Sequence, residues 1–141
     1  MSANTPSRKQ KELVKKRALW RCEYCLCPAS FSPFTFHVDH IFPFGKGGKT
    51  HLDNLAFSCG SNSFKTNRTH ARDPQTGKTV LLFHPRLQKW PEHFAWSEDA
   101  VQIIGITSTG RATVDALRMN RDELISLREL LLSAGKHPPT D

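Results

Sequence analysis

The sequence has no long apolar run, no internal repeat and no low-complexity segment. Its mean hydropathy is −0.48, and no stretch approaches the roughly 20 apolar residues that a spanning helix needs, which excludes a membrane span. Residues 1–16 are polar and then basic, without the apolar region of a secretion signal, so we expect a cytoplasmic protein. A chain of 141 residues, 38% of them hydrophobic, predicts a single domain over 1–141.

Acidic residues are scarce relative to basic ones. Twenty Lys and Arg face thirteen Asp and Glu, for a net charge of +7. Residues 1–21 hold most of the excess, whereas residues 79–141 carry seven basic and eight acidic side chains. The excess favours a nucleic-acid partner, although a solvated basic helix would explain the amino-terminal run equally well. The residues of this run are Arg8, Lys9, Lys11, Lys15, Lys16, Arg17 and Arg21.

The first half of the chain has the patterns of a helix, two strands and a second helix. Residues 7–19 contain helix formers, and residues 34–40 alternate apolar and polar side chains as a half-buried strand does. A glycine-rich loop separates this strand from a short apolar run at 55–58, which predicts a hairpin with a long tip. Residues 62–70 lack Gly and Pro, which predicts a helix after the hairpin.

The second half predicts a hairpin and a terminal helix. Residues 73–77 form a turn by composition, and strands are expected at 79–83 and 101–106, with Trp90, Phe94 and Trp96 packed between them. Asn120 is expected to cap a helix over 121–134 that has Leu124, Leu127, Leu130 and Leu131 on one face. A flexible tail is expected over 136–141.

Four cysteines and no export signal point to metal binding before disulfides, because the cytosol is reducing. Cys22 and Cys25 form a C-x-x-C knuckle whose two thiolates can hold one metal, and zinc is the default ion. Cys27 and Cys59 complete the count. The competing interpretation is that all four are small buried apolar side chains.

A second cluster follows at 37–41, where Asp39 and His40 end the predicted strand. A carboxylate there offers a hard oxygen to Mg²⁺, and an imidazole can take a proton from water near neutral pH. Asn54, Cys59, Asn62 and Lys65 then follow in order.

In this ordered set the chain resembles the HNH endonucleases from about residue 21 to residue 69. The resemblance implies an α+β fold with a ββα-metal core, treble-clef-like and of the His-Me finger type, over about 20–70. A β-hairpin and helix extension would follow over about 71–135. It also implies a metal-dependent DNA endonuclease that hydrolyses phosphodiester bonds with the aid of Mg²⁺ or Mn²⁺, and a structural zinc.

By position, the resemblance implies a role for each matching residue. His40 would be the general base, Asp39 and Asn62 would hold the catalytic ion, and Asn54 would brace the loop. Lys65 would face phosphate, and Arg68 would join Lys65 and the amino-terminal basic run in binding nucleic acid. Cys22, Cys25 and Cys59 would hold the zinc.

The chain departs from the family at the second knuckle, where Gly60 and Ser61 run directly into Asn62 and the fourth zinc cysteine is absent. Deletion of that cysteine keeps Asn62 three residues before Lys65; otherwise Ser63 would take the metal-binding place. Cys27, His51 or water could fill the fourth zinc position, or zinc could bind poorly. The alternative function is therefore a non-catalytic, zinc-stabilised DNA- or RNA-binding module.

Overall fold

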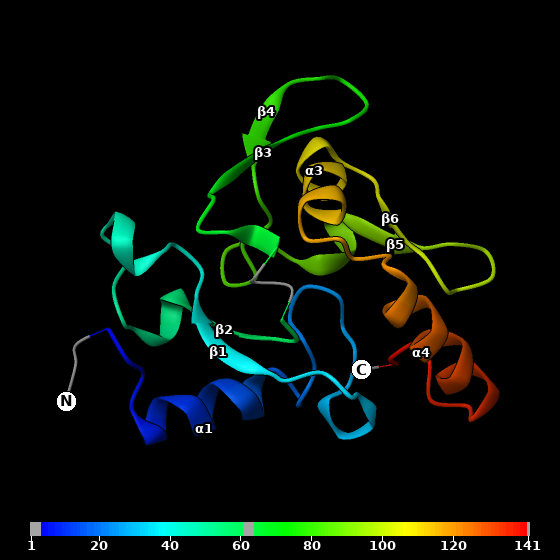
Figure 1. The fold of residues 1–141 in the computed structure, drawn as a ribbon, viewed down its shortest axis with the longest axis horizontal. Coiled ribbons are helices and arrows are strands. Elements are labelled where there is room, and N and C mark those ends of the chain that lie inside the picture. The colour runs from blue at the N-terminus through cyan, green and yellow to red at the C-terminus, as the bar shows by residue number, and fades with distance from the viewer. Residues whose placement is uncertain (1–3, 61–63, 141) are drawn as a thin grey trace.

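A computed structural model describes residues 4–60 and 64–140 of the chain (Figure 1). It confirms a mixed α+β fold, in which the described residues form three α-helices and three small antiparallel sheets of two strands each. Short 3-10 segments also lie at Ala29–Phe31, Phe44–Lys46, Leu52–Asn54 and Trp90–Glu92. None of the helices in this part of the chain has the length and apolarity needed to cross a membrane.

Helix α1 spans Arg8–Arg17, close to the predicted helix. The side chains of Ser7 and Gln10 form a capping box, each bonded to the other's backbone N–H, which satisfies two donors at the helix start. Leu19 and Trp20, just after the helix, have positive φ angles that turn the chain out of the helical path. Val14 is the residue that α1 buries, against Leu55 and Phe57.

Strands β1 (His37–His40) and β2 (Leu55–Ser58) pair antiparallel and confirm the expected pairing, with His40 opposite Leu55. The first strand is shorter than the predicted 34–40, because β2 offers only four partners and residues 34–36 lie outside the ladder. In Figure 1 α1 runs along one side of this hairpin.

The helix predicted over 62–70 is wrong beyond Lys65. Phe64 and Lys65 are helical, but Thr66 and Asn67 adopt positive φ angles that end any right-handed helix, and β3 begins at His70. Asn62 and Ser63 lie outside the described residues.

The second half contains two hairpins, one more than the sequence predicts. Strands β3 (His70–Arg72) and β4 (Thr79–Leu81) flank the expected turn, and β5 (Phe94–Trp96) pairs with β6 (Ile103–Gly105). Phe94 and Trp96 therefore form a strand, rather than packing between strands as predicted.

An unpredicted helix, α3 (Ser108–Ala116), follows β6 and packs on it. A Cβ on Gly110 would come within 2.0 Å of the His93 backbone oxygen, so this close approach requires glycine.

Helix α4 (Asp122–Ser133) confirms the terminal helix but not its predicted cap. Arg121 occupies the N-cap position, and the Asn120 side chain instead bonds both the N–H and the carbonyl of Ile103. Leu124, Leu127 and Leu131 are buried as expected, whereas Leu130 is 70% exposed, because it points away from the packed face. The predicted tail begins with ordered contacts, since His137 bonds the Ala100 carbonyl and packs edge-on against Trp96.

One core joins the two halves of the chain. Its largest cluster contains Cys22, Cys25 and Tyr24 from the first half together with Phe94 and Leu117 from the second. The indole N–H of Trp90 donates to the Tyr24 carbonyl at 2.8 Å. The cysteine loop is thus packed against the extension.

Candidate active site and cysteine cluster

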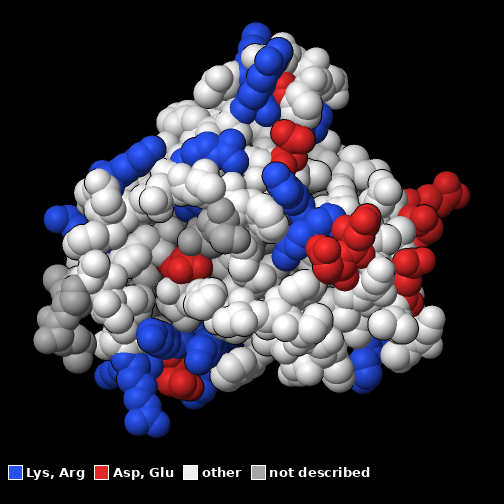
Figure 2. Space-filling view, viewed as in Figure 1, with Lys and Arg blue, Asp and Glu red and all other residues white. Residues whose placement is uncertain are grey.

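Charge is unevenly distributed over the surface. On the face that Figure 2 shows, Lys and Arg gather over α1 and also lie over the β3–β4 hairpin, whereas Asp and Glu gather over the β5–β6 loop and the start of α4. Helix α1, which carries six of the 20 Lys and Arg residues, packs on β1 and β2, the strands that hold the second predicted cluster. A polyanion would meet the molecule at this basic side.

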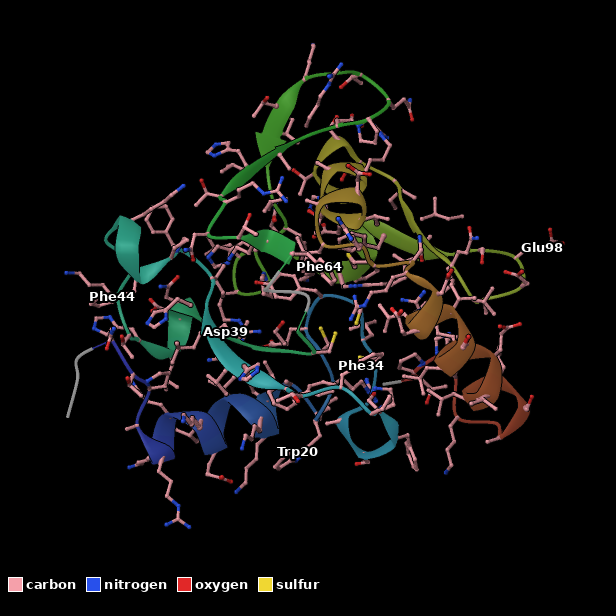
Figure 3. The ribbon with its side chains drawn as sticks, viewed as in Figure 1. Trp20, Phe34, Asp39, Phe44, Phe64 and Glu98 are labelled. Carbon is pink, nitrogen blue, oxygen red and sulfur yellow. The ribbon has the colours of Figure 1, made fainter. Side chains whose placement is uncertain are left out.

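Asp39 lies in β1, paired with Ala56 of β2 (Figure 3). Burial raises the pKa of its carboxyl, while the charges of His37, Lys65 and His40 act in the opposite direction. Among the described residues no side chain donates a hydrogen bond to the Asp39 carboxylate. A partly buried carboxylate with uncommitted oxygens fits a hard divalent cation.

His40, the next residue, ends β1 with its Nε2 atom 2.9 Å from Thr50 Oγ1. The Thr50 carbonyl accepts a bond from the Gln10 amide of α1, so the partner of His40 is itself held. Burial is the main cause that lowers the pKa of His40, which favours the neutral imidazole. Its ring lies 5.8 Å from that of Phe44, which projects from the loop after β1.

Asn54 ties the loop after β1 to the start of β2. Its amide nitrogen donates to the carbonyls of Phe42 (3.1 Å) and Lys49 (2.8 Å), and its Oδ1 accepts from the Phe42 N–H at 2.8 Å. These bonds connect both ends of the loop that follows His40.

Lys65 does not face solvent, contrary to the role in phosphate contact that the sequence predicts for it. The residue is 4% exposed, and its ammonium donates to the Ile41 carbonyl and, at 3.4 Å, to the His40 carbonyl. Burial lowers its pKa to about 8. The Lys65 charge therefore lies behind the Asp39–His40 strand end and supports its backbone.

Two of the arginines that are predicted to bind nucleic acid form hydrogen bonds within the protein instead. Arg17 donates to the carbonyls of Leu52 and Leu55, and Arg68 to those of Phe64 and Lys65. Arg21 forms an isolated backbone β-bridge with Pro28 beside the cysteine loop. The guanidinium groups of Arg17 and Arg68 hold the backbone in place, whereas Arg8, Lys9, Lys11 and Lys16 are exposed and Lys15 is partly exposed.

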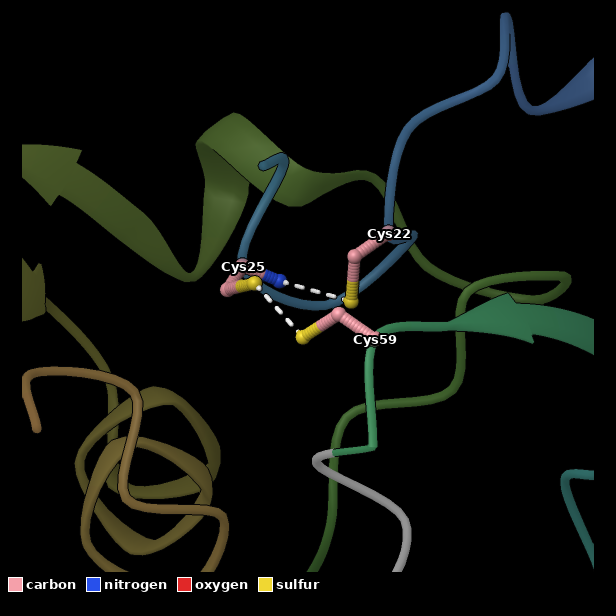
Figure 4. A group of neighbouring side chains, drawn as sticks. All are labelled: Cys22, Cys25 and Cys59. Carbon is pink, nitrogen blue, oxygen red and sulfur yellow. Dashed lines mark hydrogen bonds between the residues drawn. The ribbon is translucent and has the colours of Figure 1, made fainter. Parts of the chain in front are cut away.

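The cysteines converge from the loop at 22–27 and the end of β2 (Figure 4). The Sγ atoms of Cys22, Cys25 and Cys59 all lie within 4.8 Å of one another. Cys27 Sγ lies 3.4 Å from Cys25 Sγ, which itself lies 3.3 Å from Cys59 Sγ. All four residues are buried and free of disulfides.

The donor set fits zinc. Burial raises the pKa of the Cys22 thiol, and the contact with Cys22, together with burial, raises the pKa of the Cys27 thiol. A bound cation would favour the deprotonation of both thiols. The N–H groups of Tyr24 and Cys25 point at Cys22 Sγ, both at 3.4 Å, which is the support that a metal-bound thiolate receives.

Comparison with known proteins gives one match. Residues 22–67 match the family model described as HNH endonuclease. The predicted resemblance is confirmed. The HNH segment covers about a third of the chain and includes the cysteine cluster, Asp39, His40, Asn54 and Lys65. No curated protein and no solved structure matches the chain. Members of the HNH family are generally nucleases, which are hydrolases that use divalent metals.

Thr50 and Gln10 are site residues that the sequence did not single out. Both act through contacts between positions ten or more residues apart, His40 with Thr50 and Gln10 with Thr50, and no spacing rule links them. Cys27 is one of the candidates that the sequence offers for the fourth zinc position, and the structure brings its Sγ atom to 3.4 Å from that of Cys25.

Proposed function

We propose that the protein is a metal-dependent DNA endonuclease that hydrolyses phosphodiester bonds at Asp39 and His40. The observation that carries the proposal is their juxtaposition at the end of β1, inside the segment that matches the HNH family. No side chain of the described residues donates a hydrogen bond to the Asp39 carboxylate, and burial lowers the pKa of the neighbouring His40 imidazole. The unequal surface charge supports a polyanionic substrate.

In this proposal Asp39, with Asn62, would hold Mg²⁺ or Mn²⁺. The bound ion would stabilise charge on the phosphate and the leaving oxygen. Thr50 orients the imidazole of His40 through Nε2. Among the described residues Nδ1 has no partner, so this nitrogen can take the proton of the attacking water. Asn54 keeps the adjoining loop in place during the step.

Plasmid cleavage tests the proposal. Wild-type protein should nick or cut supercoiled DNA with Mg²⁺ or Mn²⁺, EDTA should stop the reaction, and His40→Ala should abolish cutting while DNA is still bound. Binding without EDTA-sensitive cutting in the wild type would instead show the non-catalytic, zinc-stabilised DNA- or RNA-binding module. Preferential cutting of RNA would overturn DNA as the substrate.

We also propose that Cys27 supplies the fourth ligand of a structural zinc site with Cys22, Cys25 and Cys59. The backbone supports this ligand set. Leu26 adopts a φ of 64°, and the Cys22 N–H donates to the Cys27 carbonyl at 3.0 Å, so the chain doubles back and directs Cys27 at the cluster. Cys27, two residues after the first knuckle, would take the place of the cysteine that the second knuckle lacks.

The four cysteines also lie beside cationic side chains that would complement a site with four thiolates. Such a site carries a net charge of about −2 around Zn²⁺. Arg121 Nη2 lies 3.7 Å from Cys59 Sγ, and the buried guanidinium of Arg128 is close enough for the charges of Cys25, Cys27 and Cys59 to affect its pKa.

Metal analysis separates this site from its alternatives. The wild type should carry one zinc per chain, and its cobalt-substituted form should show thiolate-to-metal charge transfer. Cys27→Ser should weaken the zinc, reduce the charge-transfer intensity and lower the melting temperature. His51→Ala is the matched control, because His51 was the competing ligand, and it should change nothing. Weakening by His51→Ala alone, or a wild type without zinc, would contradict the assignment.

A further inference from the structure

We infer that a hollow between α1 and the edge of β1 binds a phosphate of the DNA backbone through Lys11 and Lys15, next to the proposed catalytic ion. The inference rests on the proposed function and adds where the DNA backbone would pass beside the site. It also gives Lys11 and Lys15 a role that the other basic residues of α1 do not share.

The hollow has a volume of about 380 Å³. Its lining includes Lys11 and Lys15 of α1, His37 and Asp39 of β1, and Asn4, Thr5 and Pro6 before the helix. A phosphate group fits this volume, and a phosphate bound there would lie beside the carboxylate that the proposed function assigns to the ion.

The rotation of α1 explains why these two lysines line the hollow. Residues four apart lie on the same face of a helix, so Lys11 and Lys15 project together. Val14 is fully buried against the β1–β2 hairpin, and this contact fixes which face turns toward the strands.

Hydrogen bonds fix α1 at both ends. The Gln10 side chain donates to the Thr50 carbonyl near its start, and Arg17 donates to the carbonyls of Leu52 and Leu55 at its end. The helix therefore presents its lysines from a fixed position, which reduces the entropy lost when they bind a ligand.

The charges predict coupling to the metal. Among the described residues neither the Lys11 nor the Lys15 ammonium is part of an ion pair; Lys15 lies over the Trp20 ring, 5.7 Å from its centroid. An anion in the hollow is attracted by the two ammonium groups and repelled by Asp39. A divalent cation at Asp39 would remove that repulsion, so DNA and the ion should bind with positive cooperativity.

Lys9 and Lys16 provide a matched control. They lie seven residues apart on α1, project from a different face than Lys11 and Lys15, and are exposed. Substituting either pair with glutamine removes the same charge and keeps a good helix former at each position.

The test is DNA binding measured by fluorescence anisotropy in the His40→Ala background, across a salt series, with Mg²⁺ and with EDTA. Lys11→Gln/Lys15→Gln should reduce the slope of log K against log salt by roughly 1.8, which corresponds to two phosphate contacts. It should also remove the gain in affinity that Mg²⁺ gives. Lys9→Gln/Lys16→Gln should change the slope less and keep the Mg²⁺ gain.

Equal effects of the two pairs would overturn the inference, because they would show a diffuse basic surface rather than a defined phosphate position. An unchanged slope for Lys11→Gln/Lys15→Gln would overturn it as well. Failure of the proposed function would appear separately, as wild-type protein that binds DNA but does not cut it.

Discussion

The HNH segment and the extension after it both bond buried charges within the protein, Lys65 among them, but the HNH segment also has polar side chains that are open to a ligand. In the extension, over 70–135, the buried charges are bonded within the protein. Arg111 makes two bonds to the fully buried Asp73, at 3.0 and 2.9 Å, and Arg128 donates to the carbonyls of Val101 and Met119 and to Asn120. In the HNH segment, over 22–67, the Asp39 carboxylate and His40 Nδ1 have no hydrogen-bond partner among the residues that the structure describes, so both are open to a ligand.

This difference indicates that the two regions have different roles. Unsatisfied polar groups cost stability, so they are retained where they have a function and are supported by a well-packed neighbouring region. The extension provides that support, because Trp90 bonds the Tyr24 carbonyl and Arg86 forms an ion pair with Glu23, both beside the cysteine loop. Substitution of Asp39 or His40 should therefore affect mainly activity, and substitution of buried residues in the extension should affect mainly stability.

The largest expected effect is that of His40→Ala on cleavage. Loss of a general base should lower the cleavage rate by roughly 10²- to 10⁴-fold, and the melting temperature should stay close to that of the wild type. His93→Ala is the counterpart in the extension, where His93 Nδ1 bonds Thr107 Oγ1 at 2.7 Å. It should lower the melting temperature and leave the rate at low temperature unchanged. The reverse pattern would remove the contrast between the two regions.

Next in size is the loss of stability expected for Phe94→Ala. Phe94 is 2% exposed and packs its ring against Phe83 and Trp90. Truncation should lower the free energy of unfolding by about 3–5 kcal/mol in urea titrations. Leu87→Ala removes an 81%-exposed side chain and should cost less than about 0.5 kcal/mol. Similar costs for both would show that the extension is not the stabilising region.

The sequence predicts local features well and distant contacts poorly. Helix α1, strand β2, the turn before β4 and helix α4 all have clear local signals, and each is present. Helix α3 was missed because its stability depends on the capping Thr107 and on the close fit of Gly110 against His93, which no periodicity shows. Asn120 was misassigned because its partner, Ile103, lies 17 residues away.

The candidate site shows the same difference between local features and distant contacts. Ordered spacing predicts a set of site residues, from Cys22 through His40 to Lys65. It could not predict that Lys65 turns inward to the Ile41 carbonyl, or that Arg17 is occupied by Leu52 and Leu55, since both depend on how helix and hairpin pack. The position of Asn62, outside the described residues, stays a prediction.

Asn54→Ala should give an intermediate effect confined to the HNH segment. It removes three hydrogen bonds to Phe42 and Lys49, at a cost of about 1–3 kcal/mol. Amide exchange at Phe42 should become faster and cleavage slower. Asp53→Ala, at the exposed neighbouring position, should change neither quantity, and unchanged exchange at Phe42 in Asn54→Ala would show that the loop is held by other contacts.

The smallest expected effect is a displacement of the acid limb of the pH–rate profile. His40 acts as a base only when neutral, and burial lowers its pKa from the usual 6.5, so activity should be retained below pH 6.5 and fall as the pH drops through the lowered value. A cation at Asp39 would disfavour the imidazolium further and shift the limb in the same direction. Profiles of kcat/KM in saturating Mg²⁺ measure the midpoint, with linear duplex DNA as substrate. An acid limb above pH 6.5 would assign the titration to another group and leave His40 without the role of base.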